Sequence, residues 1–277
     1  MFPTTLCTDH IAWTTADDGR YRLLADDDGN TWLAAWTDQG LQVHTAAGGA
    51  EPPVPSVTAA DDLPARAPAQ LTDALTTLGT VQRLANPSLW DALSTAIMRQ
   101  VIRAGTARQR YQQWARLHGT PHTVPGGPTV YCAPGPRKVM ELPAEEFTAA
   151  GIKFFYPVLR AAAHAYLEHG DHWRHLDGDQ MVKELLAARV PRLGPWTVHT
   201  AVADYTGRFD LYPHDDLAVR TWANKAAPGV ADISDGRTFA HRWSRWADTP
   251  SQLHALTLFT LTWGSHAPGP RNTTTRP

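Results

Sequence analysis

The residues best suited to chemistry in this sequence are two adjacent carboxylates, Asp215 and Asp216. They stand just before the apolar residues 217–219, and this pattern predicts a helix that starts inside an apolar frame. A carboxylate in such surroundings can stabilise a developing positive charge and can orient an attacking water molecule. Aspartate also favours helix starts on dipole grounds, so the alternative is that both residues only cap the helix.

A tight turn joins two predicted helices shortly before these carboxylates. The first helix covers residues 179–189, the second begins at Pro195, and the turn between them reads Val190-Pro191-Arg192-Leu193-Gly194. The N–H groups at the start of a helix have no partner within it, so this turn can bind a phosphate group. We expect Arg192 and Gly194 to contribute to that contact.

One segment of the chain is purely basic. Residues 1–62 hold ten acids and two bases, whereas residues 92–140 hold no Asp or Glu. The bases of that second segment are Arg99, Arg103, Arg108, Arg110, Arg116, Arg137 and Lys138. The segment is a candidate surface for the phosphates of a nucleic acid, with an ordinary solvated helix face as the alternative.

The elements that must position these residues are mainly helical. Short alternating runs at residues 20–24, 31–36 and 41–44 predict strands, followed by a linker over residues 46–70. Residues 119–142, rich in proline and glycine, are expected to be irregular. Helices are predicted over residues 71–82, 88–103, 106–118, 143–150, 152–168, 179–189, 195–206, 215–226, 235–247 and 251–264.

This pattern predicts a mainly α protein with a small β-rich N-terminal domain. The expected division is an acidic N-terminal domain and linker over residues 1–62, a helical domain over 63–266, and a disordered tail over 267–277.

Composition excludes several classes of protein. The formal charge is -2 and the hydrophobic content is 43%, which suits a globular domain. Cys7 and Cys132 are too few for a disulfide framework or a cysteine-rich metal site. His169, His172 and His175 invite a metal hypothesis, but we expect Gly170-Asp171 to interrupt their helix and predict no metal there. No membrane span or signal peptide is readable, so we expect a soluble cytoplasmic protein.

The motifs together resemble the helix-hairpin-helix (HhH-GPD) DNA glycosylases, and most closely their 3-methyladenine DNA glycosylase II type. The family hairpin reads roughly Leu-Pro-Gly-Ile/Val-Gly, which residues 190–194 resemble, with other apolar residues at Val190 and Leu193 and with Arg192 in place of the first glycine. The family's Phe-Pro-x-Asp-Asp-Leu helix start matches residues 212–217. Residues 90–100 look like its first core helix, and Gly151-Ile152-Lys153 like another helix start. The resemblance covers about residues 85 to 264.

The resemblance implies a role for individual residues. In the family, a Val or Ile stands three positions after the catalytic aspartate. Val219 stands three positions after Asp216, so the resemblance implies that Asp216 is the catalyst and Asp215 a structural neighbour. Trp196 stands where family members with lyase activity carry lysine, which implies base removal without strand cleavage. Val101 matches the position of the side chain that fills the gap left by a flipped base. The implied base pocket contains Gln100, Trp196, Thr200, Tyr212 and Thr260.

The expected function is therefore a monofunctional DNA base glycosylase that acts on an alkylated or otherwise modified base in double-stranded DNA. Small threonines at pocket positions that commonly carry aromatics favour a second hypothesis, excision of an enlarged hypermodified base from foreign (phage) DNA. A third is a non-catalytic DNA-binding protein. We expect a monomer without a cofactor, apart from a monovalent cation that the resemblance suggests at the hairpin. His199, His214 and Asp215 are candidate proton donors, although structural roles are expected for them.

Overall fold

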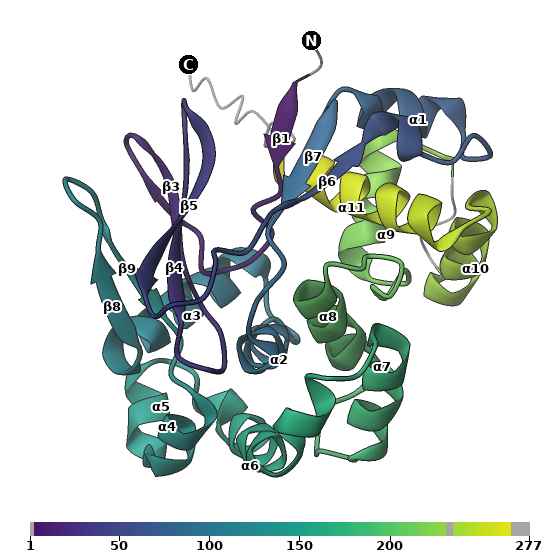
Figure 1. Cartoon of the computed structure of the whole chain (residues 1–277). Helices are drawn as coiled ribbons and strands as arrows, with labels where there is room; N and C mark the ends of the chain where they lie inside the picture. The colour runs from purple at the N-terminus through teal and green to yellow at the C-terminus, as the bar shows by residue number, and fades with distance from the viewer. Residues whose placement is uncertain (1–2, 231–234, 267–277) are drawn as a thin grey trace, which may run out of the picture. The chain divides into compact units, whose positions relative to one another are not determined.

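The structure of the protein is a computed structural model that describes residues 3–230 and 235–266 (Figure 1). The expected disordered tail, residues 267–277, lies outside the described residues. The chain divides into two compact units that interleave along the sequence. The first unit is Met1–Asp9, Thr58–Val81 and His214–Pro277, and the second is His10–Val57 and Gln82–Pro213. Residue 62, where the sequence analysis places a domain boundary, is inside the first unit.

An antiparallel sheet opens the second unit. Its strands follow the chain in the order β2 (Thr14–Ala16), β3 (Gly19–Ala25), β4 (Thr31–Thr37) and β5 (Gly40–Ala47). This confirms the predicted strands, although β3 and β4 each bury a continuous run of residues at their centre instead of alternating. Leu23 pairs with Leu33 across the sheet, and both are buried.

The segment 119–142 is not irregular, contrary to the sequence-based expectation. It forms the hairpin β8 (Thr120–Thr123) and β9 (Thr129–Cys132), followed by helix α4 (Pro136–Glu141). Val130 of β9 is buried with Leu33 of the first sheet, which explains why the hairpin is ordered. Pro136 suits the first turn of a helix, where its missing N–H is not needed.

Helices complete the second unit around one core. They are α2 (Leu89–Met98), α3 (Ala104–His118), α5 (Ala144–Ala149), the 3-10 turn η2 (Lys153–Phe155), α6 (Tyr156–Trp173), α7 (Gly178–Ala187) and α8 (Pro195–Thr206). Helix α2 is the centre of this core: all but one of its residues are buried, and it packs against α6 and α8.

Two helix boundaries in this unit differ from the predictions. The helix predicted over residues 88–103 ends at Met98, because the backbone of Val101 is left-handed, with a φ of 54°. Helix α6 runs through Gly170 and Asp171 to Trp173, so the expected interruption is wrong. The packing at this position favours glycine, because a Cβ atom on Gly170 would lie only 2.9 Å from the ring of Tyr166.

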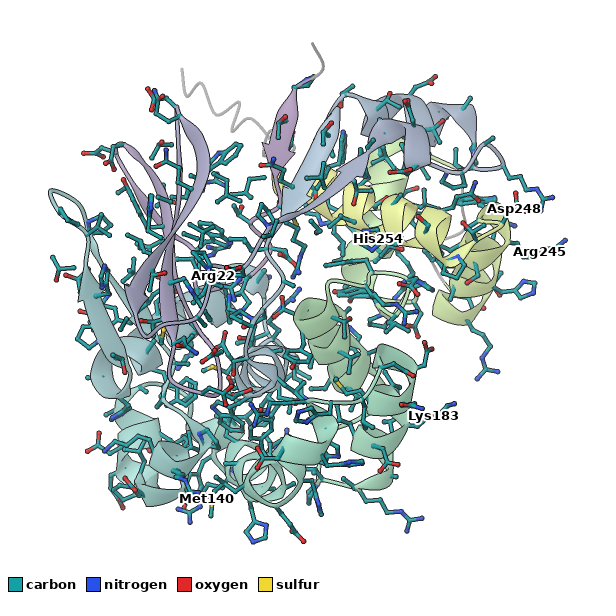
Figure 2. The ribbon with its side chains drawn as sticks, viewed as in Figure 1. Arg22, Met140, Lys183, Arg245, Asp248 and His254 are labelled. Carbon is teal, nitrogen blue, oxygen red and sulfur yellow. The ribbon has the colours of Figure 1, made fainter. Side chains whose placement is uncertain are left out.

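In its described residues, the first unit combines a small sheet with four helices. The sheet has the order β1-β7-β6, and the bounds of its strands are β1 (Thr4–Leu6), β6 (Ser56–Ala59) and β7 (Thr80–Arg83). The other elements are the 3-10 turn η1 (Ala60–Asp62), α1 (Ala69–Thr76), α9 (Leu217–Ala226), α10 (Gly236–Trp246) and α11 (Pro250–His266). His254 of α11 contacts the Thr58 hydroxyl at 3.2 Å (Figure 2).

The sequence analysis missed part of this unit. The predicted linker, residues 46–70, contains β6, η1 and the start of α1. The helix predicted over residues 71–82 ends at Thr76, because the chain turns at Gly79 (φ 66°) into β7. Within the described residues, no helix has both the length and the apolar character needed to cross a bilayer.

Candidate functional site

The predicted hairpin is present in the second unit, between α7 and α8. Val190 and Leu193 are buried and anchor it, whereas Pro191 and Arg192 are exposed. Arg192 takes a left-handed backbone with a φ of 65°, so the turn keeps a conformation that favours glycine and tolerates arginine in it. Gly194 precedes α8 and no side chain caps that helix. The N–H groups of the first turn of α8 can therefore serve an anion.

Gln100 connects the end of α2 to this hairpin. Its side-chain amide donates to the carbonyl oxygen of Arg192 at 3.0 Å and also to the hydroxyl of Thr197. The side-chain nitrogen of Gln100, a predicted pocket residue, thus donates both of its hydrogen bonds to the hairpin and α8. Its side-chain oxygen can still accept a hydrogen bond. The turn that follows Gln100 is held at a fixed place beside the hairpin.

Val101 lies in that turn and is the most unusual residue of the site. Its side chain is 83% exposed, and its φ of 54° is a conformation that β-branched residues rarely adopt. Such strain costs on the order of 1–3 kcal/mol and concentrates at functional positions. An exposed apolar side chain next to the hairpin fits the wedge position that the resemblance implies for Val101.

The candidate basic residues differ in their surroundings. Arg103 is exposed just before α3, and Arg99 stands at the end of α2. Arg108 donates to the carbonyl oxygen of Trp13 at 2.7 Å, so its guanidinium also anchors the N-terminal segment. The guanidinium of Arg192 lies 4.3 Å from the ring centre of Phe154. Phe154 is 54% exposed, and sequence reasoning missed it although it directly follows the Gly151-Ile152-Lys153 motif.

The remaining pocket candidates of the second unit lie on α8 and just after it. Trp196 is half-buried, and Tyr212 is buried and stacks on Phe209 with ring centres 5.7 Å apart. Thr200 is only 3% exposed, and its hydroxyl has no hydrogen-bond partner among the described residues. An unpaired buried hydroxyl costs roughly 1–3 kcal/mol, which makes Thr200 a position where a ligand could supply the missing partner.

His199 has a defined tautomer in this arrangement. Its Nδ1 lies 2.8 Å from the carbonyl oxygen of Leu211. A carbonyl oxygen only accepts, so the neutral imidazole carries its proton on Nδ1 and presents an unprotonated Nε2.

The candidate carboxylates and Thr260 belong to the first unit. Asp216 occupies the position before α9 and is half-buried, yet its side chain makes no capping hydrogen bond to that helix. Asp215 is exposed, and its carbonyl oxygen accepts from Arg220 Nε at 3.0 Å. Thr260 of α11 is fully buried and its hydroxyl lacks a hydrogen-bond partner among the described residues.

A buried ionic cluster fixes α2 and α8, the two helices that carry the hairpin and Gln100. Asp91 of α2 and Asp204 of α8 both lie near His10 Nε2, at 3.3 Å and 3.7 Å. Asp204 also pairs with the guanidinium of Arg83, and Asp91 lies 3.7 Å from Arg22. Figure 2 labels Arg22. Burial alone would raise the pKa of both carboxyl groups, but His10 and the guanidinium groups of Arg22 and Arg83 hold the pKa of each below its usual value.

Comparison with solved structures identifies the fold. The 3-methyladenine DNA glycosylase from Archaeoglobus fulgidus is 14% identical, with a TM-score of 0.67 over 91% of this chain and 90% of that chain. MBOgg1 in complex with a low-affinity DNA ligand is also 14% identical, with a TM-score of 0.65 over 92% and 88%. The apo-form of the 8-oxoguanine glycosylase/lyase from Clostridium acetobutylicum is 12% identical, with a TM-score of 0.59 over 90% and 98%.

At the level of sequence, no family model and no curated protein matches the chain. The structural likeness nevertheless extends over both units, because it covers about nine-tenths of the chain. The expectation drawn from residues 190–194 and 212–217 is thereby confirmed for the fold. The protein has the fold of the helix-hairpin-helix DNA glycosylases.

Proposed function

We propose that the protein is a monofunctional DNA base glycosylase that flips a modified base and hydrolyses its N-glycosidic bond. The observation that carries the proposal is the carboxylate of Asp216. It stands at the start of α9 without capping that helix, in a chain with the fold of DNA glycosylases. The lack of a side-chain capping hydrogen bond speaks against the alternative role that the sequence leaves open for Asp216, helix capping.

The proposed reaction begins with DNA binding. The hairpin amides and Arg99, Arg103 and Arg192 hold phosphates of double-stranded DNA, and the protein acts as a monomer. Flipping costs roughly a few kcal/mol, and Val101 fills the gap that the flipped nucleotide leaves. Phe154, beside Arg192, adds an aromatic face to the same surface.

Bond cleavage then depends on Asp216. The bond between C1′ and the base nitrogen breaks, and its electron pair leaves with the base. The Asp216 carboxylate stabilises the resulting sugar cation and orients a water molecule that attacks C1′. The proton of that water passes to the carboxylate, and the product is an abasic site.

The nature of the base follows from the proton balance. A cationic, alkylated base leaves without a proton, whereas a neutral base needs a donor. The candidate donors nearest in sequence are His199, His214 and Asp215, and structural roles are expected for all three. We therefore favour a base that is already positively charged.

The product should be an intact strand. Trp196 occupies the position of the lysine that lyases use, so no amine is available there to form a Schiff base with the sugar. The cation suggested for the hairpin stays a separate proposal. The carbonyl oxygens of Val190, Arg192 and Gly194 already accept hydrogen bonds from Leu193, Gln100 and Val198, and no step above depends on a metal.

Thr200 supports a second candidate function, excision of an enlarged hypermodified base from foreign DNA. Its buried hydroxyl has no partner among the described residues, and a threonine leaves more room than an aromatic side chain. Such a site suits a larger base with polar substituents. A non-catalytic DNA-binding protein would show neither activity.

Replacing Asp216 with Asn tests the proposal. The substitution keeps the shape and removes the charge, so base release should fall about 10²-fold or more while DNA affinity is retained. Asp215→Asn is the matched control, because its exposed neighbouring carboxylate should matter little. Base release would be quantified by mass spectrometry and binding by fluorescence anisotropy. Full activity of Asp216→Asn would overturn the assignment.

A further inference from the structure

The second unit contains a cavity of about 620 Å³ that the proposed function does not use. It lies between the sheet and the helices α2 and α6, and is lined by Leu23 and Ala25 of β3, Trp90 and Asp91 of α2, and Tyr166 of α6, among others. None of Asp216, Thr200 or the hairpin residues lines it. Its volume is in the range of small-molecule binding sites, roughly 300–1,000 Å³.

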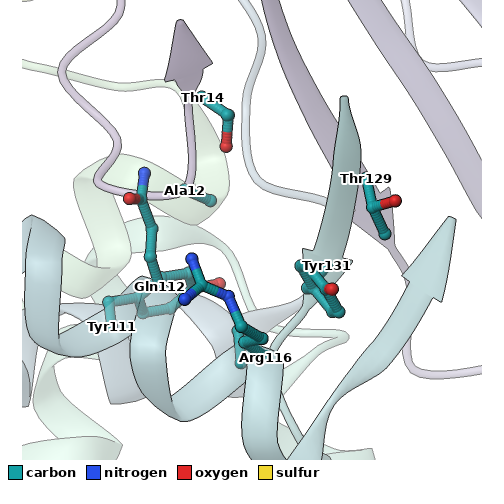
Figure 3. A pocket seen from close by; sticks show the side chains of 8 residues that line it. Ala12, Thr14, Tyr111, Gln112, Arg116, Thr129 and Tyr131 are labelled. Carbon is teal, nitrogen blue, oxygen red and sulfur yellow. The ribbon is translucent and has the colours of Figure 1, made fainter. Parts of the chain in front are cut away.

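A neighbouring pocket provides a useful contrast. It lies between α3 and β9, is lined by Gln112, Arg116 and Tyr131, and shares Tyr111 with the larger cavity (Figure 3). Its volume is about 60 Å³, which is room for a few water molecules. The smaller pocket is a packing gap, whereas the larger cavity can admit an organic molecule.

Two carboxylates in this cavity are held in fixed orientations. Asp27 accepts hydrogen bonds from the hydroxyls of Tyr166 and Ser88, at 2.7 Å and 2.8 Å. Asp91 accepts from the hydroxyl of Tyr111 at 2.7 Å. Each oxygen of an ionised carboxylate can accept a further hydrogen bond, so both groups can still serve a ligand. The side chain of Asp91 keeps 19% of its surface accessible although it belongs to the buried ionic cluster, because the cavity reaches it.

The cavity has an excess of negative charge. Four of its lining residues are acidic, Asp26, Asp27, Asp91 and Asp171, and two are basic, Arg137 and Arg174. Arg174 pairs with Asp171 and with Asp28 at its exposed rim. Arg22 lies 3.7 Å from Asp91 and offsets part of its charge, so Asp27 is the stronger anionic partner for a ligand. A ligand that brings positive charge would be attracted.

The walls are suited to the same kind of ligand. Trp90, Tyr111 and Tyr166 line the cavity, and the rings of Trp90 and Tyr166 lie 5.8 Å apart. Aromatic rings attract cations through the negative potential of their faces. From the volume, the two oriented carboxylates and the aromatic walls, we propose that this cavity binds a small organic cation, with Asp27 and Asp91 as its anionic partners.

Calorimetric titration of the full chain tests this inference with two cationic probes, 1,4-diaminobutane and N-methylpyridinium. The first represents an aliphatic ammonium and the second a flat heterocyclic cation. The neutral control for the first is 1,4-butanediol. At least one cation should bind, the diol should not, and Asp27→Asn should weaken binding about tenfold or more. Asp38→Asn is the matched control, because Asp38 is exposed in another turn of the same sheet and does not line the cavity.

A second variant keeps the test decisive if Asp27→Asn does not fold. Ala25→Phe places a larger side chain in the cavity wall and leaves every charge in place, so it should also abolish binding of the cation. Circular dichroism establishes that each variant is folded. Failure of both cations to bind the wild-type protein would overturn the inference, as would equal binding of the diol or unchanged affinity in folded Asp27→Asn.

Discussion

Helices α2 and α8 pack against each other, and the residues at the two ends of this helix pair differ in burial and charge. At one end, Asp91 and Asp204 sit in a buried cluster with His10, Arg22 and Arg83, where charged groups are matched by opposite charges. At the other end, Val101 is exposed in a strained left-handed conformation, next to a hairpin that exposes unpaired helix amides. Strain of this kind persists only where surrounding contacts fix it. The ionic cluster joins α2 to α8 at the end away from the hairpin, and the proposed DNA contacts lie at the other end.

Breaking the ionic cluster should have the largest effect. Asp204→Ala leaves the buried guanidinium of Arg83 without its carboxylate partner, and the free energy of unfolding should fall by about 3–5 kcal/mol. Asp179→Ala removes an exposed ion pair with Arg208 and should cost about 1 kcal/mol or less. Urea unfolding followed by circular dichroism compares the two variants. Equal losses of stability in the two variants would show that the buried cluster stabilises the fold no more than an exposed ion pair does.

Stability should depend on pH through the same cluster. The folded pKa values of Asp91 and Asp204 lie below the unfolded value of about 4, so their contribution is complete above that value and is lost as the pH falls through the folded pKa. Burial raises the pKa of Asp27, so that group acts in the opposite direction. The free energy of unfolding should begin to fall below about pH 5 and should keep falling below about pH 3, towards the folded pKa values. Asp91→Asn should flatten this slope, and an unchanged slope would contradict the assignment.

Charge reversal at the other end should affect DNA binding rather than folding. Arg103→Glu and Arg192→Glu should each lower affinity for all sequences and reduce the slope of log affinity against log salt by about 1. Arg116→Glu is the comparison, because Arg116 lines the small pocket beside Tyr131 instead of the hairpin surface (Figure 3). Anisotropy titrations at several salt concentrations give the slopes. If Arg116→Glu alone changed the slope, the DNA surface would lie elsewhere.

The smallest expected change in stability comes from Val101. Glycine adopts a left-handed backbone without strain, so Val101→Gly should leave stability unchanged or raise it by up to about 1 kcal/mol. The same variant loses the wedge, and base release should slow although DNA still binds. Val54→Gly, at another exposed valine, should not alter base release. Base release at the wild-type rate by Val101→Gly would remove Val101 from the mechanism.

Local patterns explain how much of this could be read from the sequence. The strands around Leu23 and the helix from Pro195 to Thr206 follow from alternation and from helix-start signals, and both were predicted. The hairpin β8–β9 was missed because its prolines suggested irregular chain, whereas burial of Val130 decides its structure. The left-handed backbone of Val101 contradicts the preference of valine and depends on tertiary contacts.

The long-range contacts of the site could not be read from the sequence in the same way. His10, Asp91 and Asp204 meet only after folding, since more than a hundred residues separate the second and third. No spacing rule connects them. The contact between Arg192 and Phe154 has the same origin. By contrast, Asp216 was readable because its helix start is local, and its catalytic role stays a prediction until activity is measured.

The central claim is that the protein releases a base from DNA without cutting the strand. The most direct test incubates the wild-type protein with duplexes that each carry one alkylated, oxidised or enlarged base, and identifies released bases by mass spectrometry. We predict a free modified base and an intact abasic strand that breaks only after alkali or heat. Absence of base release from every duplex would contradict the account, as would a protein–DNA adduct trapped by borohydride during turnover.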